Sequence, residues 1–145
     1  MSPPAGNDNP IPGRTYVLTI FGTETAFQVE GDDIYLRPYD ASCLDQKFVC
    51  DVYEGRLGFV NQNKEKRLGR NRYENIKCED SPATRGSWQA FFFRANPGGG
   101  FIMSTTIDDT YIQLRRTDDG SPGNYWLTIK DRDHSIPVVV GMTQV

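Results

Sequence analysis

Two adjacent carboxylates and a nearby tyrosine have the side-chain chemistry of a sugar-binding loop. Asp108 and Asp109 precede Tyr111 by three and two positions. Loop carboxylates accept hydrogen bonds from sugar hydroxyls, and an exposed aromatic ring supplies a rigid contact surface beside them. The alternative is turn chemistry, because Asp side chains also bond their own backbone in turns. This group therefore predicts a carbohydrate site in the later part of the chain.

A second candidate site is a basic segment in a chain whose formal net charge is -3. Its candidate ligand-binding residues are Asn61, Arg67, Arg70, Arg72 and Tyr73. Such a hairpin suits an acidic protein surface, a phosphate group or an anionic glycan. The alternative is a solvated hairpin whose charges keep the protein soluble. These cations are too few, in an acidic chain, to indicate a nucleic-acid-binding surface. We therefore expect no nucleic-acid partner.

The residue patterns of catalysis and cofactor binding are sparse. Residues 131–135 place carboxylates beside His134 and Ser135, but side chains of adjacent residues point apart and cannot form a catalytic relay. The sequence has no cysteine and histidine spacing typical of zinc sites and no phosphate-binding glycine loop. We predict no catalytic residue, metal or cofactor. An enzyme with an unrecognised small-molecule pocket is the third alternative.

These residues are positioned by a chain that reads as short β-strands. From residue 15 onward, apolar segments of strand length alternate with Gly, Asp, Asn and Pro, and no segment has helical periodicity. The expected strands cover residues 16–21, 26–29, 34–38, 47–53, 57–61, 73–78, 88–94, 101–105, 111–116, 125–129 and 138–140. The pattern predicts an all-β protein, in which the apolar run at residues 136–140 pairs with the first strand or covers one end of the barrel.

An internal repeat of roughly forty residues organises these strands. The two series of apolar markers are Val17, Phe59 and Phe101 at the start of each unit and Phe48, Trp88 and Trp126 near its end. Three such repeats, each with four short strands, resemble a β-trefoil. We therefore predict a flexible leader over residues 1–13 and a single β-trefoil domain over residues 14–145.

The second unit carries the most specific resemblance. GRLGFVN at 55–61, RLGR at 67–70 and ENIKC at 74–78 resemble the repeat of fascin-type, actin-crosslinking trefoils. SWQAF at 87–91 and NPGGGF at 96–101 resemble single-domain members of this group that are common in fungal genomes. The resemblance implies a trefoil fold and binding to actin.

The chain also departs from these families. Fascins resemble chains of four trefoils, whereas this chain has one, and Arg67 stands where the fascin repeat has an aromatic residue. The lectin-type trefoils of the ricin family carry Gln-x-Trp in each unit, and only Gln46-Lys47-Phe48 approximates it. A ricin-like sugar site is therefore not transferred residue by residue.

The prediction for function is a non-catalytic, lectin-like binding module. The alternative is a protein-binding trefoil, either actin-binding or inhibiting a protease through loops 22–25 and 81–86, the latter containing Arg85. The longest uncharged apolar run, residues 136–142, is too short to span a bilayer, and the first residues do not form a secretory signal. We expect a cytoplasmic protein with free thiols and no membrane partner. The sequence does not indicate the oligomeric state.

Overall fold

The computed structural model describes residues 5–118, 120–121, 123–132 and 134–145, and the chain there is all-β, as predicted. Short 3-10 helices occur at η1 (Leu44–Gln46) and η2 (Ser87–Gln89). The strands are β1 (Thr15–Ile20), β2 (Thr25–Glu30), β3 (Asp33–Pro38), β4 (Lys47–Tyr53), β5 (Arg56–Asn61), β6 (Arg67–Arg70), β7 (Ile76–Asp80), β8 (Phe92–Ala95), β9 (Phe101–Ile107), β10 (Thr110–Gln113), β11 (Arg115–Thr117), β12 (Trp126–Thr128), β13 (Ile136–Pro137) and β14 (Val140–Gln144). None of the helices in the described residues is long and apolar enough to cross a membrane.

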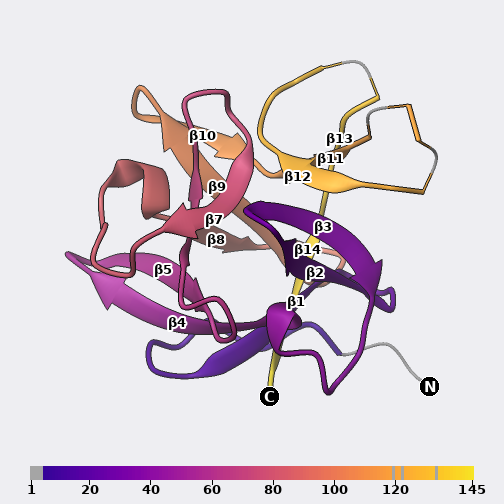
Figure 1. Ribbon diagram of the computed structural model, residues 1–145, viewed down its shortest axis with the longest axis horizontal. Helices are drawn as coiled ribbons and strands as arrows, with labels where there is room; N and C mark the ends of the chain where they lie inside the picture. The colour runs from indigo at the N-terminus through magenta and orange to yellow at the C-terminus, as the bar shows by residue number, and fades with distance from the viewer. Residues whose placement is uncertain (1–4, 119, 122, 133) are drawn as a thin grey trace.

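A closed ring of antiparallel strands forms the body of the molecule (Figure 1). β1 pairs with β14 on one side and with β4 on the other, β4 pairs with β5, and β9 pairs with both β8 and β14. The Leu57–Phe91 bridge joins β5 to the start of β8 and completes the ring. Closure leaves few open strand edges, which stabilises a sheet protein against edge-to-edge association.

Hairpins outside the ring meet one another through single pairings. Asp33 of β3 pairs with Lys77 of β7, Tyr35 of β3 pairs with Trp126 of β12, and Asn75 bridges to Thr128. A ring of strands with hairpins that contact one another agrees with the predicted trefoil. The last strand, β14, pairs with β1 over its whole length. Of the run 136–140 that was expected to pair with the first strand, only Val140 belongs to β14, whereas Ile136 and Pro137 form β13 and pair with β11.

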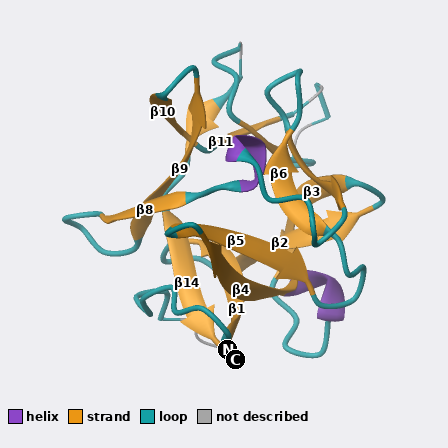
Figure 2. Ribbon diagram, turned by 90° about the vertical axis from the view of Figure 1, so that its left-hand side faces the viewer, coloured by secondary structure: helices purple, strands orange, loops and turns teal. Residues whose placement is uncertain are grey.

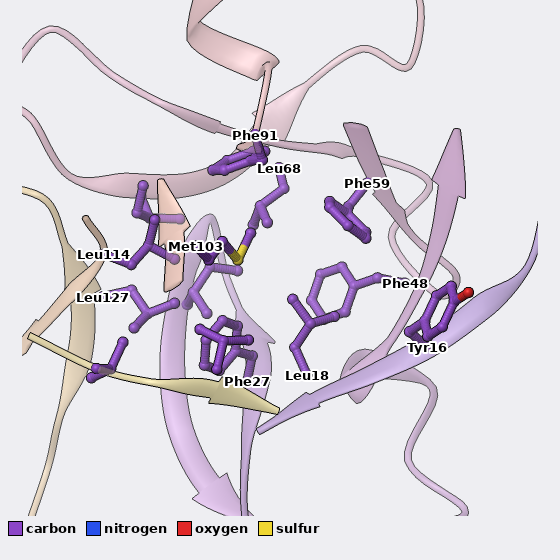
Figure 3. Packing of buried hydrophobic residues seen from close by; sticks show 14 of the residues in the cluster. Tyr16, Leu18, Phe27, Phe48, Phe59, Leu68, Phe91, Met103, Leu114 and Leu127 are labelled. Atoms are coloured by element: carbon purple, nitrogen blue, oxygen red, sulfur yellow. The ribbon is translucent and has the colours of Figure 1, made fainter. Parts of the chain in front are cut away.

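The core fills the space between the ring strands and the hairpins (Figure 3). Its largest apolar side chains include Phe27, Phe48, Phe59, Phe91 and Met103, all almost fully buried. In β4 the burial alternates along the strand, which is the period of a sheet with one face on the core. Each such side chain contributes about 1.5–3 kcal/mol through burial.

Residues 5–13 differ from the flexible leader that the sequence predicts. The Asp8 amide donates to the Met142 carbonyl oxygen (2.9 Å), and the Met142 amide donates to the Gly6 carbonyl oxygen (2.9 Å). The buried Tyr16 hydroxyl donates to the Asn9 carbonyl oxygen (2.7 Å). These contacts are mostly between backbone groups, which composition does not reveal. Residues 1–4 lie outside the described residues.

Two of the expected strands begin three or four residues later than expected, and the strand expected over 111–116 is divided into β10 and β11. The strand expected over 73–78 is β7, which begins at Ile76 because Glu74 adopts a left-handed turn conformation (φ 63°). The strand expected over 88–94 is β8, which begins at Phe92, and Trp88 lies in η2 with 41% of its surface exposed. Trp88 is therefore not a core marker of a repeat.

Candidate functional site

The predicted carbohydrate residues lie on the β9–β10 hairpin (Figure 2). Asp108 (φ 48°) and Asp109 (φ 64°) form its two-residue turn, and Ile107 pairs with Thr110. Both turn positions need positive φ, which Asp tolerates better than most residues. The turn sets the register of β10, and the Tyr111 side chain projects from this strand. Tyr111 is 65% exposed. Turn chemistry and an exposed aromatic ring thus occur together at this hairpin.

Tyr111 lies on the outward face of the sheet formed by β8, β9 and β10. Ser104 of β9 pairs with Phe92 of β8 and with Gln113 of β10, so these side chains form one row. The rings of Phe92 and Tyr111 meet edge to face, with centroids 5.1 Å apart and an interplanar angle of 83°. A surface groove of about 540 Å³ follows this face, lined by Phe92, Phe93, Arg94, Ile102, Ser104, Tyr111 and Gln113.

The inner face of the same sheet is fixed by core packing. Phe93 contacts Phe59 and Phe101 in edge-to-face pairs at 5.6 and 6.1 Å. Because Phe93 is anchored, its neighbour Phe92 is held on the opposite, outward face of β8. In the run of three phenylalanines at 91–93, Phe92 is the ring on the outward face and lines the groove.

The groove combines its aromatic rings with neutral hydrogen-bonding groups. The Gln113 amide nitrogen donates to the Val138 carbonyl oxygen (3.0 Å), which orients the side chain and leaves its oxygen as an acceptor. The Ser104 hydroxyl faces the same groove. Small-molecule sites in proteins have this composition: an apolar lining with a few placed polar groups. Asp108 and Asp109 are exposed at the hairpin tip, beyond the lining residues.

Tyr111 differs from the other strongly exposed aromatic residues of the described chain. A guanidinium stacks on the ring of each of those residues at 4.6, 4.8 and 5.5 Å, in the pairs Arg70–Trp88, Arg72–Tyr73 and Arg85–Tyr53. No such pair involves Tyr111 among the described residues. Its ring is therefore the more available for stacking on a ligand.

Arg67 was predicted to belong to an exposed basic site, but the structure places its side chain inside the protein. Its side chain is 2% exposed and forms a two-pronged ion pair with Asp51, at 2.9 and 2.6 Å. Nε and Nη2 also donate to the Pro82 carbonyl oxygen, at 2.9 and 2.7 Å. The hydrogen bonds from Arg67 lower the pKa of the Asp51 carboxyl group. The donors of this guanidinium are thus taken up by Asp51 and Pro82 inside the protein.

Asn61 was also predicted to bind a ligand, but its side chain is fully buried. Its amide nitrogen donates to the carbonyl oxygens of Asp45 (3.0 Å) and Lys47 (3.2 Å). Its oxygen accepts from the backbone amides of Asn63 (3.2 Å) and Lys64 (2.9 Å). Asn61 therefore shapes the turn between β5 and β6 and has no free group for a ligand.

The remaining residues of the predicted basic site contact different parts of the protein. Arg70 donates through Nε to the Thr106 carbonyl oxygen (2.9 Å). Arg72 and Tyr73 lie together in the exposed turn between β6 and β7, where the guanidinium donates to the tyrosine hydroxyl (2.6 Å). Of the three predicted arginines, Arg67 is therefore buried, Arg70 is hydrogen-bonded to β9 and Arg72 is exposed.

Arg85, the candidate contact of a protease, is held against the protein. Its guanidinium lies 3.3 Å from the Asp51 carboxylate and stacks over the Tyr53 ring at 5.5 Å. A protease pocket that accepts arginine requires the side chain to project freely. The geometry of Arg85 therefore does not favour the inhibitor alternative.

The predicted absence of a catalytic relay near the end of the chain concerns His134 and Ser135. His134 lies in an exposed turn (φ 67°), and the Ser135 hydroxyl donates to the Arg132 carbonyl oxygen (2.8 Å). The same hydroxyl accepts from Arg115 Nε (2.9 Å). Its hydrogen-bonding capacity is thus taken up by arginine residues. Asp133 of this segment lies outside the described residues.

Comparisons with known proteins identify the fold. No protein-family model matches the sequence, and no curated protein is detectably similar to it in sequence. A ricin B-like lectin of Macrolepiota procera, solved in complex with lactose, aligns with a TM-score of 0.65 and 12% identity over 95% of this chain and 100% of the lectin. The Haemophilus ducreyi cytolethal distending toxin aligns with a TM-score of 0.66 and 10% identity, over 96% of this chain and 89% of the toxin chain.

Cry35Ab1 aligns with a TM-score of 0.61 and 13% identity, over 93% of this chain but only 36% of its own. Identities this low bear on the fold and not on the residues of a site. This chain has the all-β fold of a ricin B-like lectin.

Proposed function

We propose that this chain is a non-catalytic carbohydrate-binding module, a β-trefoil of three repeats whose sugar site is the groove on β8, β9 and β10. The observation that carries the proposal is Tyr111, an exposed ring that lines a groove with neutral polar groups and has no stacked guanidinium among the described residues. The shared fold with a lectin solved in complex with lactose supports it.

Different residues of the groove contact different parts of the bound sugar. Tyr111, steadied by Phe92, offers an apolar surface to the C–H face of a sugar ring. The Ser104 hydroxyl and the Gln113 oxygen exchange hydrogen bonds with sugar hydroxyls at the centre of the groove. Asp109, at the tip of the hairpin, accepts hydrogen bonds from hydroxyls that extend beyond the groove.

The first test is a glycan-array screen of the purified protein, followed by titration of the strongest neutral glycan. We expect Tyr111→Ala to weaken binding by at least about tenfold, because the ring provides the main apolar contact. Tyr53→Ala is the matched control, because Tyr53 is also exposed but lies outside the groove and carries a stacked arginine. Its affinity should equal that of the unmodified protein.

Two outcomes contradict the proposal. One is an array on which no glycan binds, and the other is a bound glycan whose affinity does not change in Tyr111→Ala. Co-sedimentation with filamentous actin is run in parallel. A blank array together with actin pelleting would support the protein-binding alternative.

A further inference from the structure

Arg94 gives the groove a positive charge that the described protein does not neutralise. It lies two residues after Phe92 on β8, on the same outward face, and it lines the groove. Within the described residues it forms no ion pair and does not stack on an aromatic ring. Most other arginines have such partners, for example Arg37 with Glu30 and Arg116 with Tyr125.

Charge is distributed unevenly along the groove. Arg94 pairs with Ile102 and Tyr111 pairs with Thr106, four residues further along β9. The Cα atoms of Arg94 and Tyr111 therefore lie about 13 Å apart along the strand direction and about 10 Å apart across the three strands. Asp108 and Asp109 lie beyond Tyr111 at the hairpin tip. One end of the site is thus positive, and the other end is neutral and then negative.

We infer that this groove selects acidic oligosaccharides, with a neutral sugar ring on Tyr111 and an anionic oxygen group on Arg94. The inference rests on the proposed function, because it assigns a ligand class to the same site. A planar guanidinium donates two parallel hydrogen bonds to a carboxylate or to a sulfate ester, and both groups present oxygens at suitable spacing. The carboxylates at the tip repel an anion from the other end, so the charge distribution also sets the direction of the bound chain.

The test is an array that presents neutral glycans beside their sulfated and sialylated derivatives. We expect the acidic derivatives to bind about fivefold more tightly than the parent glycan, which is the scale of an exposed ion pair. This ratio should fall as ionic strength rises, because salt screens exposed charges. The sulfated and sialylated members distinguish a sulfate ester from a carboxylate as the preferred group.

Variants separate this inference from the proposed function. Arg94→Gln should bring the ratio of acidic to neutral binding close to one, whereas Arg14→Gln, which removes an exposed guanidinium outside the groove, should leave it unchanged. Neutral glycans that bind through Tyr111 with no preference for acidic derivatives would overturn the inference and leave the proposed function in place. The absence of binding to any glycan would overturn both. A preference that persists in Arg94→Gln would also overturn the inference.

Discussion

The ion pair between Asp51 and Arg67 predicts a large effect from a small substitution. Asp51→Asn keeps the shape of the side chain but removes the charge opposite a guanidinium that is 2% exposed. The two hydrogen bonds from Arg67 to the Pro82 carbonyl oxygen remain, so the loop that begins at residue 81 keeps part of its anchor. The arginine is then a buried cation without its counter-ion.

The magnitude follows from the burial of the two partners. Removing one partner of a fully buried pair costs about 3–5 kcal/mol of folding free energy. Asp51 is 28% exposed, so water compensates for part of the loss, and we expect about 2–3 kcal/mol. For a domain of this size, this change lowers the midpoint of thermal unfolding by about 7–10 °C. Thermal unfolding followed by circular dichroism at neutral pH measures it.

The dependence on pH tests the cause of the effect. The folded-state pKa of Asp51 lies below its unfolded value, chiefly because of the hydrogen bonds from Arg67. The stability that the carboxylate provides is therefore complete above an unfolded pKa of about 3.9 and is lost as the pH falls through the lower folded pKa. The difference between the unmodified protein and Asp51→Asn should be constant near neutrality and should shrink below about pH 4.

Asp32→Asn serves as the control, because Asp32 is exposed and its side chain has no ion pair among the described residues. We expect its unfolding midpoint to match that of the unmodified protein at neutral pH. The reasoning is refuted if Asp51→Asn unfolds at the same temperature as Asp32→Asn. A destabilisation of Asp51→Asn that does not diminish in acid would also refute it.

Two further perturbations follow from the packing of the molecule. Gly99→Ala should lower the free energy of unfolding by about 2–4 kcal/mol in urea titrations, because Gly99 has φ 106° and an added Cβ would overlap the Phe21 ring. The neighbouring Gly98→Ala should have little effect, since its Cβ would approach Asn96 no closer than 3.6 Å. With a thiol reagent at about pH 8, Cys43 should react first, because burial raises the pKa of the other thiols to about 12 and only a thiolate is nucleophilic. The thiols expected to react only on unfolding are Cys50 and Cys78.

The fold was accessible from the sequence where burial depends on local alternation. β4 and β5 were predicted almost to the residue because their side chains alternate between core and surface. β6 was missed as a strand because it begins with Arg67, a charge whose partner lies sixteen residues away on β4. The local pattern around Trp88 resembles a strand, but the tryptophan stacks with Arg70 outside the core. The fascin-like resemblance, the fungal origin and the cytoplasmic location stay predictions.

The candidate site could be predicted from the sequence only in part, because some of its residues are brought together by strand pairing. Tyr111 and the Asp108–Asp109 turn are adjacent in sequence, so their proximity was predictable. Phe92 and Gln113 join them only through the register of β8, β9 and β10, which a single sequence does not specify. Asn61 was misassigned because a polar side chain that is satisfied internally has the same local pattern as one that binds a ligand.

The hydrogen bonds between residues 6–8 and β14 bring the start of the described chain beside its end. Figures 1 and 2 both place the chain end marked C at the bottom of the molecule and β10 near the top. A tether attached to the C-terminus therefore emerges from the side opposite the β9–β10 hairpin. When the protein is fixed to a sensor chip or fused to another domain through this end, the β9–β10 hairpin lies on the side away from the attachment. Attachment through the C-terminus thus leaves the hairpin of the proposed sugar site accessible.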